Sequence, residues 1–281
     1  MLRNAGNAME RARNPIRPAN TAGIEIAARY SFPPNCHGYC GPSSFVHTLK
    51  EHLERKKGNW IGKGDGIVRL KTQLSRFCTL HAYLKFIARE KNSKKINGFD
   101  PFDRDVVEAF WIGNELLEDI SRADLSRFIR RDLFPKSDSR RANRLADGLP
   151  EGMVPHHSFN ALYVKFVTGR VKRSVKNFDS CCITFGKVLS VSADRKTAHM
   201  GRASVSWNAE LGFCFAPLRS TVALERMGVR FLDLDNDPLR KDDLVSVHWG
   251  MAVEKIRPSA CRAIRKYTQI NMDAVNSLLH R

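Results

Sequence analysis

The spacing of apolar residues divides the chain into a helical part followed by a part rich in strands. Within residues 67–90, apolar side chains such as Leu70 and Leu74 recur every three or four positions, which places them on one face of a helix. Loops rich in Gly, Pro and Asn separate similar segments, and Pro33 and Pro34 are expected to end the first of them. The predicted helices cover residues 24–30, a segment capped by Ser43 or Ser44, and residues 67–90, 103–120, 122–134 and 140–146.

The pattern changes after residue 177. Residues 183–191 and 203–207 alternate between apolar and polar positions, as half-buried strands do. Short strands separated by turns are typical of a small barrel. The last segment, residues 258–279, has helical spacing and begins with Pro258, which suits the first position of a helix. Further segments rich in β-forming residues cover 213–215, 221–224 and 244–249.

Together these patterns predict an α+β protein in three parts. Residues 1–23 carry four arginines against one acidic residue and are expected to form a basic flexible tail. Residues 24–177 are predicted to form a mainly helical domain, in which the apolar residues 161–167 fit either a helix or a strand. Residues 178–281 are predicted to form a small OB-like β-barrel with a C-terminal helix.

The strong positive charge adds a question about partners. A net charge of +18 attracts nucleic acid, anionic lipid or an acidic protein. The basic residues are spread over many segments, without a zinc finger or an RNA-recognition motif, so nucleic-acid binding is an alternative that we do not favour. Without a bilayer-spanning apolar run or a signal peptide, we expect a cytoplasmic protein with no membrane span, and its seven cysteines are expected to be mostly free thiols.

A Gly- and Pro-rich loop carries the first candidate chemistry. Cys36, His37 and Cys40 lie within five residues, where a turn can bring two thiolates around one metal ion. Cys40 precedes Gly41-Pro42 near a predicted helix N-terminus, a position that favours thiolate. A C-x-x-x-C spacing is not a standard zinc spacing, so a purely structural turn is the competing interpretation.

Two adjacent histidines form the second candidate. His156 and His157 follow a proline, and the expectation is either one metal ligand beside a solvated histidine or two surface histidines. Cys40 and His157 also supply the residue types of a cysteine-dependent hydrolase or transferase. Neither a phosphate-binding P-loop nor a dinucleotide-binding glycine pattern is present, so we expect no bound ATP or NAD.

Two stretches of the strand-rich part carry a family resemblance. In the first, Cys181 is followed by four mostly apolar residues and then by Gly-Lys-Val at 186–188. The second, residues 243–256, reads Asp-Leu-Val-Ser-Val-His-Trp-Gly-Met-Ala-Val-Glu-Lys-Ile and has a predicted helix after it. In this order the two stretches resemble the HypC/HupF chaperones that mature nickel–iron hydrogenases, over about one third of the chain.

The resemblance implies a fold and a site. It implies an OB-like barrel with a C-terminal helix, in which Cys181 holds an iron that carries diatomic ligands, or docks a partner, with His248 near it. This chain departs from the family in three ways: some 180 residues precede the cysteine, the segment 201–240 between the motifs is longer, and Cys182 adds a second thiol. If both cysteines lie on a strand, they point to opposite faces and do not chelate one metal.

The whole chain also resembles an uncharacterised bacterial family. In that family a Gly-Tyr-Cys-Gly-Pro loop, a His-His-Ser-Phe segment and a Val-His-Trp segment recur together. These segments correspond to residues 38–42, 156–159 and 247–249 of this chain. The resemblance implies no particular activity.

These observations lead to one favoured interpretation and two alternatives. We expect a chaperone or scaffold rather than an enzyme. This protein would handle iron, or as a second choice zinc, in hydrogenase maturation. Its partner would be another maturation factor or a hydrogenase large subunit. The alternatives are the cysteine-dependent enzyme and a basic nucleic-acid-binding OB-fold protein. The expected metal ligands are Cys181 and His248, with Cys36, His37, Cys40, His156 and His157 as further candidates.

Overall fold

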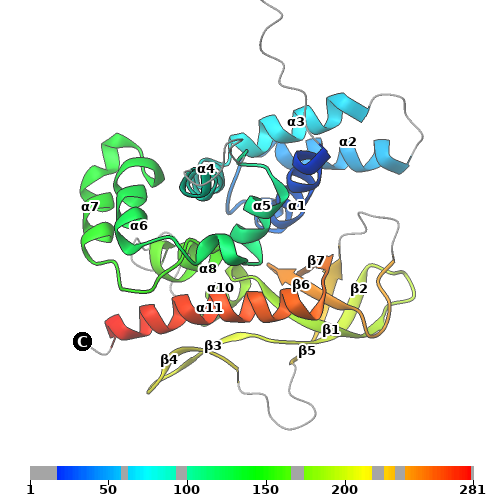
Figure 1. Cartoon of the computed structure of the whole chain (residues 1–281). Coiled ribbons are helices and arrows are strands. Elements are labelled where there is room, and N and C mark those ends of the chain that lie inside the picture. The colour runs from blue at the N-terminus through cyan, green and yellow to red at the C-terminus, as the bar shows by residue number, and fades with distance from the viewer. Residues whose placement is uncertain are drawn as a thin grey trace, which may run out of the picture.

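The computed structural model describes residues 18–57, 63–92, 100–165, 174–216, 225–231 and 238–279. Helices come first, strands follow, and a long helix closes the chain (Figure 1). The predicted mixed fold with this order of elements is therefore confirmed. Within the described residues, no helix combines the length and the apolar character needed to cross a membrane.

The first part of the chain is built from helices and short helical turns. Its main helices are α1 (Pro18–Cys36), α2 (Phe45–Lys57), α3 (Lys63–Ser75), α4 (Cys78–Asn92), α5 (Arg104–Trp111), α6 (Arg122–Phe128), α7 (Ser139–Asp147), α8 (His157–Phe159) and α10 (Val175–Cys181). Short turns of 3-10 and π type complete it: η1 (Glu115–Leu117), η2 (Ile129–Leu133), η3 (Lys136–Asp138) and η4 (Asn160–Val164).

Helix α1 corrects two predictions. Residues 18–23 belong to this helix rather than to a tail, while residues 1–17 lie outside the described residues. The helix also continues through Pro33 and Pro34 instead of ending before them. Two prolines near a helix end remove only the hydrogen bonds of their missing N–H groups, and the helix stops two residues later at Cys36.

The prediction of one long helix over residues 67–90 is wrong in one respect, because the structure has two helices there, α3 and α4, with a short turn between them. In this turn, the N–H groups of Arg76 and Phe77 donate to carbonyls only three residues earlier in the chain, which tightens the turn and ends α3. Likewise, α5 ends at Trp111 rather than at residue 120, since the N–H groups of Ile112 and Gly113 both bond the carbonyl of Glu108. The short helix predicted near residues 140–146 is confirmed as α7, and residues 161–164 are helical.

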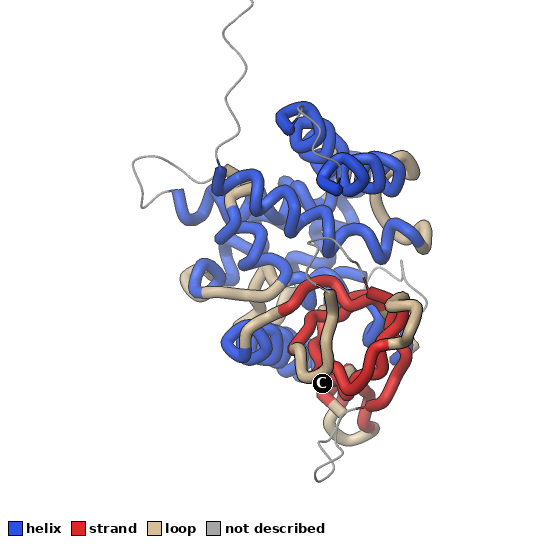
Figure 2. The backbone as a smooth tube through the Cα atoms, turned by 90° about the vertical axis from the view of Figure 1, so that its right-hand side faces the viewer, coloured by secondary structure: helices blue, strands red, loops and turns tan. Residues whose placement is uncertain are grey.

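Five strands close into a barrel (Figure 2). Strand β1 (Thr184–Val191) pairs with β2 (Thr197–Arg202) on one side and with β6 (Leu244–His248) on the other. Strand β5 (Glu225–Phe231) pairs with β2, and β7 (Met251–Lys255) completes the circle between β5 and β6. Only the β5–β7 pair is parallel among these pairings.

A separate hairpin lies in the long segment between the two motifs. Its strands are β3 (Val205–Asn208) and β4 (Gly212–Phe215), which pair only with each other among the described residues. Residues 221–224, which were predicted to form a strand, lie outside the described residues. The closing helix α11 (Pro258–Leu279) matches its predicted bounds, and its Asn276 bonds the backbone of Phe213 in β4.

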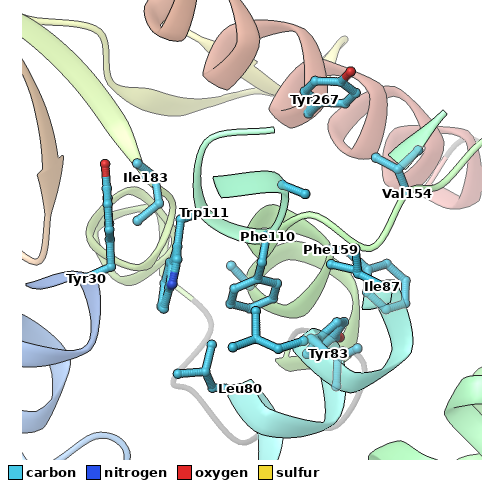
Figure 3. Close-up of a cluster of buried hydrophobic side chains, with 14 of the residues drawn as sticks. Tyr30, Leu80, Tyr83, Ile87, Phe110, Trp111, Val154, Phe159, Ile183 and Tyr267 are labelled. Atoms are coloured by element: carbon cyan, nitrogen blue, oxygen red, sulfur yellow. The ribbon is translucent and has the colours of Figure 1, made fainter. Parts of the chain in front are cut away.

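One hydrophobic core joins the helices to the barrel. It extends from Ile24 in α1 to Val275 in α11 and includes Ile183, next to β1. Figure 3 shows part of this core, where Tyr30 and Trp111 lie beside Ile183. The predicted domain boundary near residue 177 falls inside α10, whose Phe178 belongs to the same core. A smaller apolar cluster fills the barrel itself: Val188, Ala198, Met200, Leu239, Val245, Val247 and Ala252.

Candidate functional site

A cavity of about 650 Å³ lies between the loop after α1, the start of α4, α5, η4 and the turn between β6 and β7. It brings together four of the predicted site residues: Cys40, His157, Cys181 and His248. Three other predicted residues, Cys36, His37 and His156, do not line it.

Cys181 is the last residue of α10, so the case of two cysteines on one strand does not arise. Its side chain is buried, and its sulfur lies 3.2 Å from the amine of Lys165, at the end of η4. Helix α10 is fixed to the barrel, because Asp179 forms an ion pair with Arg202 of β2. The position of Cys181 in the cavity therefore depends on both parts of the fold.

Lys165 is a further residue of the site, and no sequence pattern predicts it. Burial disfavours its charged form, but the neighbouring Cys181, and more weakly Cys40 and Cys182, outweigh that effect and raise the pKa of its amine. The amine thus remains an ammonium group between thiols. An adjacent ammonium group stabilises a thiolate, which is the nucleophilic and metal-binding form of cysteine.

Cys182 follows in extended backbone and is fully buried. Burial, followed by the charges of Cys181 and Asp179, raises the pKa of its thiol well above the usual value. Cys182 does not line the cavity. Of the two adjacent cysteines, Cys181 is therefore the one whose sulfur can meet a ligand there.

Cys40 lies in the loop between α1 and α2, and the side-chain amide of Asn35 holds this loop by donating to the carbonyls of Cys40 and Pro42. The prediction that Cys40 favours thiolate is wrong for this structure. Helix α2 begins only at Phe45, and burial raises the pKa of the Cys40 thiol to about 11 despite the opposing charge of Lys165. Cys40 is therefore a neutral thiol at neutral pH.

The rest of that loop forms an aromatic contact with the barrel rather than a metal cluster. Cys36 is exposed at the end of α1. Tyr39 stacks on Trp249 with ring centres 4.1 Å apart, and the ring of His37 lies 6.0 Å from the same tryptophan. The three predicted loop residues therefore do not converge, and only Cys40 reaches the cavity.

Trp249 adopts an unusual backbone conformation. Together with Gly250 it forms the turn between β6 and β7, and both have positive φ angles, +49° and +71°. Such turns normally take Asn or Gly at the first of these positions, so a tryptophan there is strained. Its backbone N–H bonds the carbonyl of Ser180, and its ring lines the cavity. Strain of this kind commonly accompanies a binding or catalytic site.

His248 stands at the end of β6, and its Nδ1 lies 2.8 Å from the carbonyl oxygen of Tyr30. That carbonyl is available because Pro34, four residues later in α1, has no N–H to bond it. A carbonyl can only accept, so Nδ1 carries the proton and Nε2 presents a lone pair. Nε2 has no hydrogen-bond partner among the described residues.

The charge state of His248 follows from its environment. Burial lowers its pKa to about 3, although the carbonyls of Tyr30 and Cys181 favour the charged form. The ring is therefore neutral at neutral pH. A neutral histidine whose other nitrogen donates to a backbone carbonyl is the usual arrangement of a metal-ligating histidine.

His157 and His156 have different roles. Both are buried, so the prediction that at least one of them is exposed to solvent is wrong. The ring of His157 lies 5.1 Å from that of His248 and stacks on Trp111, and burial and then the neighbouring His248 lower its pKa. The Nδ1 of His157 has no hydrogen-bond partner in the described part of the chain. His156 instead caps α8: its Nδ1 accepts from the N–H of Ser158, and its Nε2 contacts the carbonyl of Trp111.

These residues do not form a preassembled metal site. Within the described ranges, no group of three or more His, Cys, Asp or Glu side chains is placed to hold a metal ion. The arrangement offers instead one thiol beside an ammonium group, one neutral thiol and two neutral imidazoles around an open volume. Such a set fits a nucleophilic thiol or a transient metal contact better than a permanent, closed metal centre.

Comparison with known proteins adds a family but no activity. Neither the curated proteins nor the solved structures contain a match to this chain. One family model, described as a family of unknown function (DUF6390), matches residues 19–281. This match covers nearly the whole chain, and the protein therefore belongs to the family of unknown function DUF6390.

Proposed function

We propose that this chain is an accessory protein that receives a thiophilic metal ion, iron in the first place and zinc in the second, and passes it to a protein partner. The observation that carries the proposal is that Cys40 and Cys181, which are 141 positions apart in the sequence, line one cavity together with His248. In this proposal the metal ion is cargo rather than a resident cofactor.

The chemistry of the three side chains supports transient binding. Thiolates and neutral imidazoles are ligands for Fe²⁺ and Zn²⁺. Cys181 would bind first, because the ammonium group of Lys165 lies 3.2 Å from its sulfur. Cys40 must lose a proton before it can bind, since the pKa of its thiol is about 11. A site that completes its ligand set only on loading can also release its cargo.

The resemblance to the HypC/HupF chaperones suggests the setting. It supports maturation of a nickel–iron hydrogenase, with another maturation factor or the hydrogenase large subunit as the partner. The net charge of +18 would help the chain to dock on an acidic partner. The barrel with its closing helix α11 agrees with the fold that the resemblance implies.

Metal loading under anaerobic conditions tests the proposal. The full chain would be incubated with Fe²⁺, desalted and analysed for bound iron, alongside Cys181→Ser, Cys40→Ser and His248→Ala. Cys214→Ser is the matched control, because Cys214 lies on β4 and does not line the cavity. We expect Cys181→Ser to lose most of the iron and the control to retain it. Equal iron content in Cys181→Ser and the wild type would reject the proposal.

A second candidate is a cysteine-dependent hydrolase or transferase, and one contact favours it. The contact between Lys165 and Cys181 is of the kind that activates a nucleophile. It shifts the candidate nucleophile from Cys40 to Cys181, because the high pKa of Cys40 leaves that thiol protonated. If Cys181 reacts rapidly with thioester or acyl donors and the protein takes up no iron, this candidate replaces the first.

A further inference from the structure

The cavity is much larger than a metal ion requires. Its volume of about 650 Å³ lies within the range of roughly 300–1,000 Å³ that holds small organic ligands. One water molecule occupies only about 30 Å³ of the liquid. The cavity therefore has room for an organic molecule next to the two cysteines.

The walls define the charge of such a molecule. Lys165 and Arg76 are the two basic side chains that line the cavity, and neither Asp nor Glu is among its described lining residues. The ammonium group of Lys165 already faces the sulfur of Cys181, whereas Arg76 is exposed. Two basic side chains and no acidic one among the described lining residues favour an anionic ligand.

Hydrogen-bonding groups without partners point to the same class of ligand. Native proteins leave few buried polar groups unpaired. In the described residues ten buried side-chain atoms lack a partner, and five of these atoms belong to residues that line this one cavity. They are Ser31 Oγ, Trp111 Nε1, His157 Nδ1, His248 Nε2 and Trp249 Nε1. The two indole nitrogens can only donate, so acceptor atoms of a ligand would satisfy them.

The remaining walls are apolar. Figure 3 shows Trp111 next to Phe110 and Leu80, which also line the cavity. An inorganic anion would leave this surface without contacts, whereas an aliphatic or aromatic group would bury it. The other large apolar lining residues are Phe77, Leu133, Phe134 and Val164.

We propose that the cavity binds a small organic carboxylate with an apolar body. Its carboxylate oxygens accept hydrogen bonds from the indole N–H groups of Trp111 and Trp249 and from Lys165, and its body contacts Leu80 and Phe110. The few donor groups and the otherwise apolar walls suit the two oxygens of a carboxylate better than the three strongly hydrated oxygens of a phosphate monoester. The ligand is additional to the metal ion, and this inference does not rest on metal handling.

Titration of the full chain with matched organic compounds tests the inference. Hexanoate, octanoate and benzoate would be compared with hexanol, hexylamine and hexyl phosphate by calorimetry and by thermal unfolding. We expect only the carboxylates to bind and to raise the melting temperature, and longer chains to bind more tightly. If no carboxylate binds at millimolar concentration, or if hexanol binds equally well, the inference is wrong. Preferential binding of hexyl phosphate would also overturn it.

Tryptophan variants locate the binding site. Trp111→Phe and Trp249→Phe each remove one N–H donor and keep an aromatic ring, and we expect roughly tenfold weaker carboxylate binding, as for loss of a hydrogen bond to a charged group. Trp207→Phe is the matched control, since Trp207 lies on β3 and does not line the cavity. Equal losses in all three variants would place the ligand elsewhere.

Iron uptake measured with and without a carboxylate separates this inference from the proposed function. Uptake of iron without binding of any carboxylate would reject only the inference. Binding of a carboxylate by a protein that takes up no iron would reject only the proposed function.

Discussion

The charge on Lys165 controls the chemistry of Cys181. A buried thiol without a partner behaves as a small apolar side chain. Here the amine of Lys165 lies 3.2 Å from the sulfur, and the charges of the thiols raise the pKa of that amine. The sulfur of Cys181 therefore lies in contact with an ammonium group. Cys40 lines the same cavity but remains protonated, with a pKa of about 11, so the two thiols differ in reactivity.

Replacement of the lysine tests this difference. In Lys165→Met the sulfur of Cys181 loses its counter-ion, and we expect alkylation of Cys181 by iodoacetamide to slow roughly tenfold or more at neutral pH. The rate at Cys181 would be followed by mass spectrometry of the peptide that contains it. Lys176→Met serves as the matched control, because Lys176 is an exposed lysine of α10 that does not line the cavity. Unchanged alkylation in Lys165→Met would show that the ammonium group does not activate Cys181.

The buried histidines make stability depend on pH. Burial lowers the pKa of His248 to about 3, that of His156 to about 4 and that of His157 well below its usual value. In the unfolded chain these rings take up protons below about pH 6.5, so the unfolded state binds more protons than the folded state. The stabilisation is therefore complete above that pH and is lost as the pH falls toward 3.

Chemical denaturation at several pH values measures this loss. We expect the free energy of unfolding to be constant above pH 7 and to fall below about pH 6.5 by up to about 1.4 kcal/mol per pH unit for each buried histidine. His156→Asn is expected to reduce the slope by one such contribution. His199→Asn, which changes an exposed histidine of β2, is the control and is expected to leave the slope unchanged. A flat profile between pH 7 and 5 would contradict neutral, buried rings.

The sequence identified some of these residues and could not identify others. Cys181 and His248 were found through the family resemblance, and Cys40 and His157 through their residue types and neighbours. Lys165 was missed, because its importance comes from a contact across 16 positions that no periodicity encodes. Trp111 was missed for the same reason, since an aromatic residue on a predicted helix is typical of a core residue.

At the scale of elements, the loop that carries Cys40 depends on Gly41. Its φ angle is +80°, and a Cβ atom at this position would lie 2.1 Å from the ring of Phe77. Phe77 in turn lines the cavity and contacts Phe45 of α2 edge to face. The turn between α3 and α4 therefore places the ring of Phe77 against the loop. The loop can lie there only because residue 41 has no side chain.

Gly41→Ala is expected to displace this loop. Gly152→Ala introduces the same positive-φ strain without a clash, because nothing lies within 4 Å of a Cβ atom there, and it should lower the free energy of unfolding by about 1–2 kcal/mol. Gly41→Ala is expected to cost more than this control and to speed the alkylation of Cys40. Equal unfolding free energies and equal Cys40 reactivity in the two variants would contradict the proposed role of the loop.

Element prediction succeeded where periodicity was continuous and failed where single contacts decided. Helix α11 was predicted to the residue, because its apolar spacing is uninterrupted and Pro258 marks its start. Strands β2 and β7 were not predicted, since only their pairing in the barrel distinguishes these short segments from loops. Pro33 and Pro34 predict a helix end, but α1 continues through them. One of the carbonyls that they leave free, that of Tyr30, accepts a hydrogen bond from His248 instead.

The distribution of exposed aromatic side chains bears on the nucleic-acid alternative. An OB-fold that binds single strands stacks bases on aromatic residues of one barrel face. Among the described side chains the exposed large hydrophobic residues are Tyr39, Val68, Val175, Trp207 and Leu211, and none of these lies on a barrel strand. The positive charge by itself predicts salt-sensitive, sequence-independent attraction to polyanions.

At the scale of the whole molecule, the shared core predicts that the helices and the barrel unfold together. The hydroxyl of Tyr30 in α1 donates to Ser246 in β6 at 2.8 Å, and the carbonyl of the same tyrosine bonds His248. Residues of α1, α10 and α11 belong to one hydrophobic cluster with Ile183. Separation of the two parts would expose this cluster and would dismantle the cavity between them, at a cost in both apolar burial and unpaired polar groups.

Equilibrium unfolding in urea, followed by two probes, checks this expectation. Far-UV circular dichroism reports mainly the helices, whereas tryptophan fluorescence includes Trp111 from α5 and Trp249 from the barrel. We expect coincident midpoints for the two probes, and we expect Tyr30→Phe, which removes the bond to Ser246, to shift both midpoints downward together. Two separate midpoints, or a fragment of residues 178–281 that folds alone, would instead show that the chain consists of two independent domains. In that case Cys40 and Cys181 would meet only when the domains dock, and the cavity would be an interface that opens to admit its cargo.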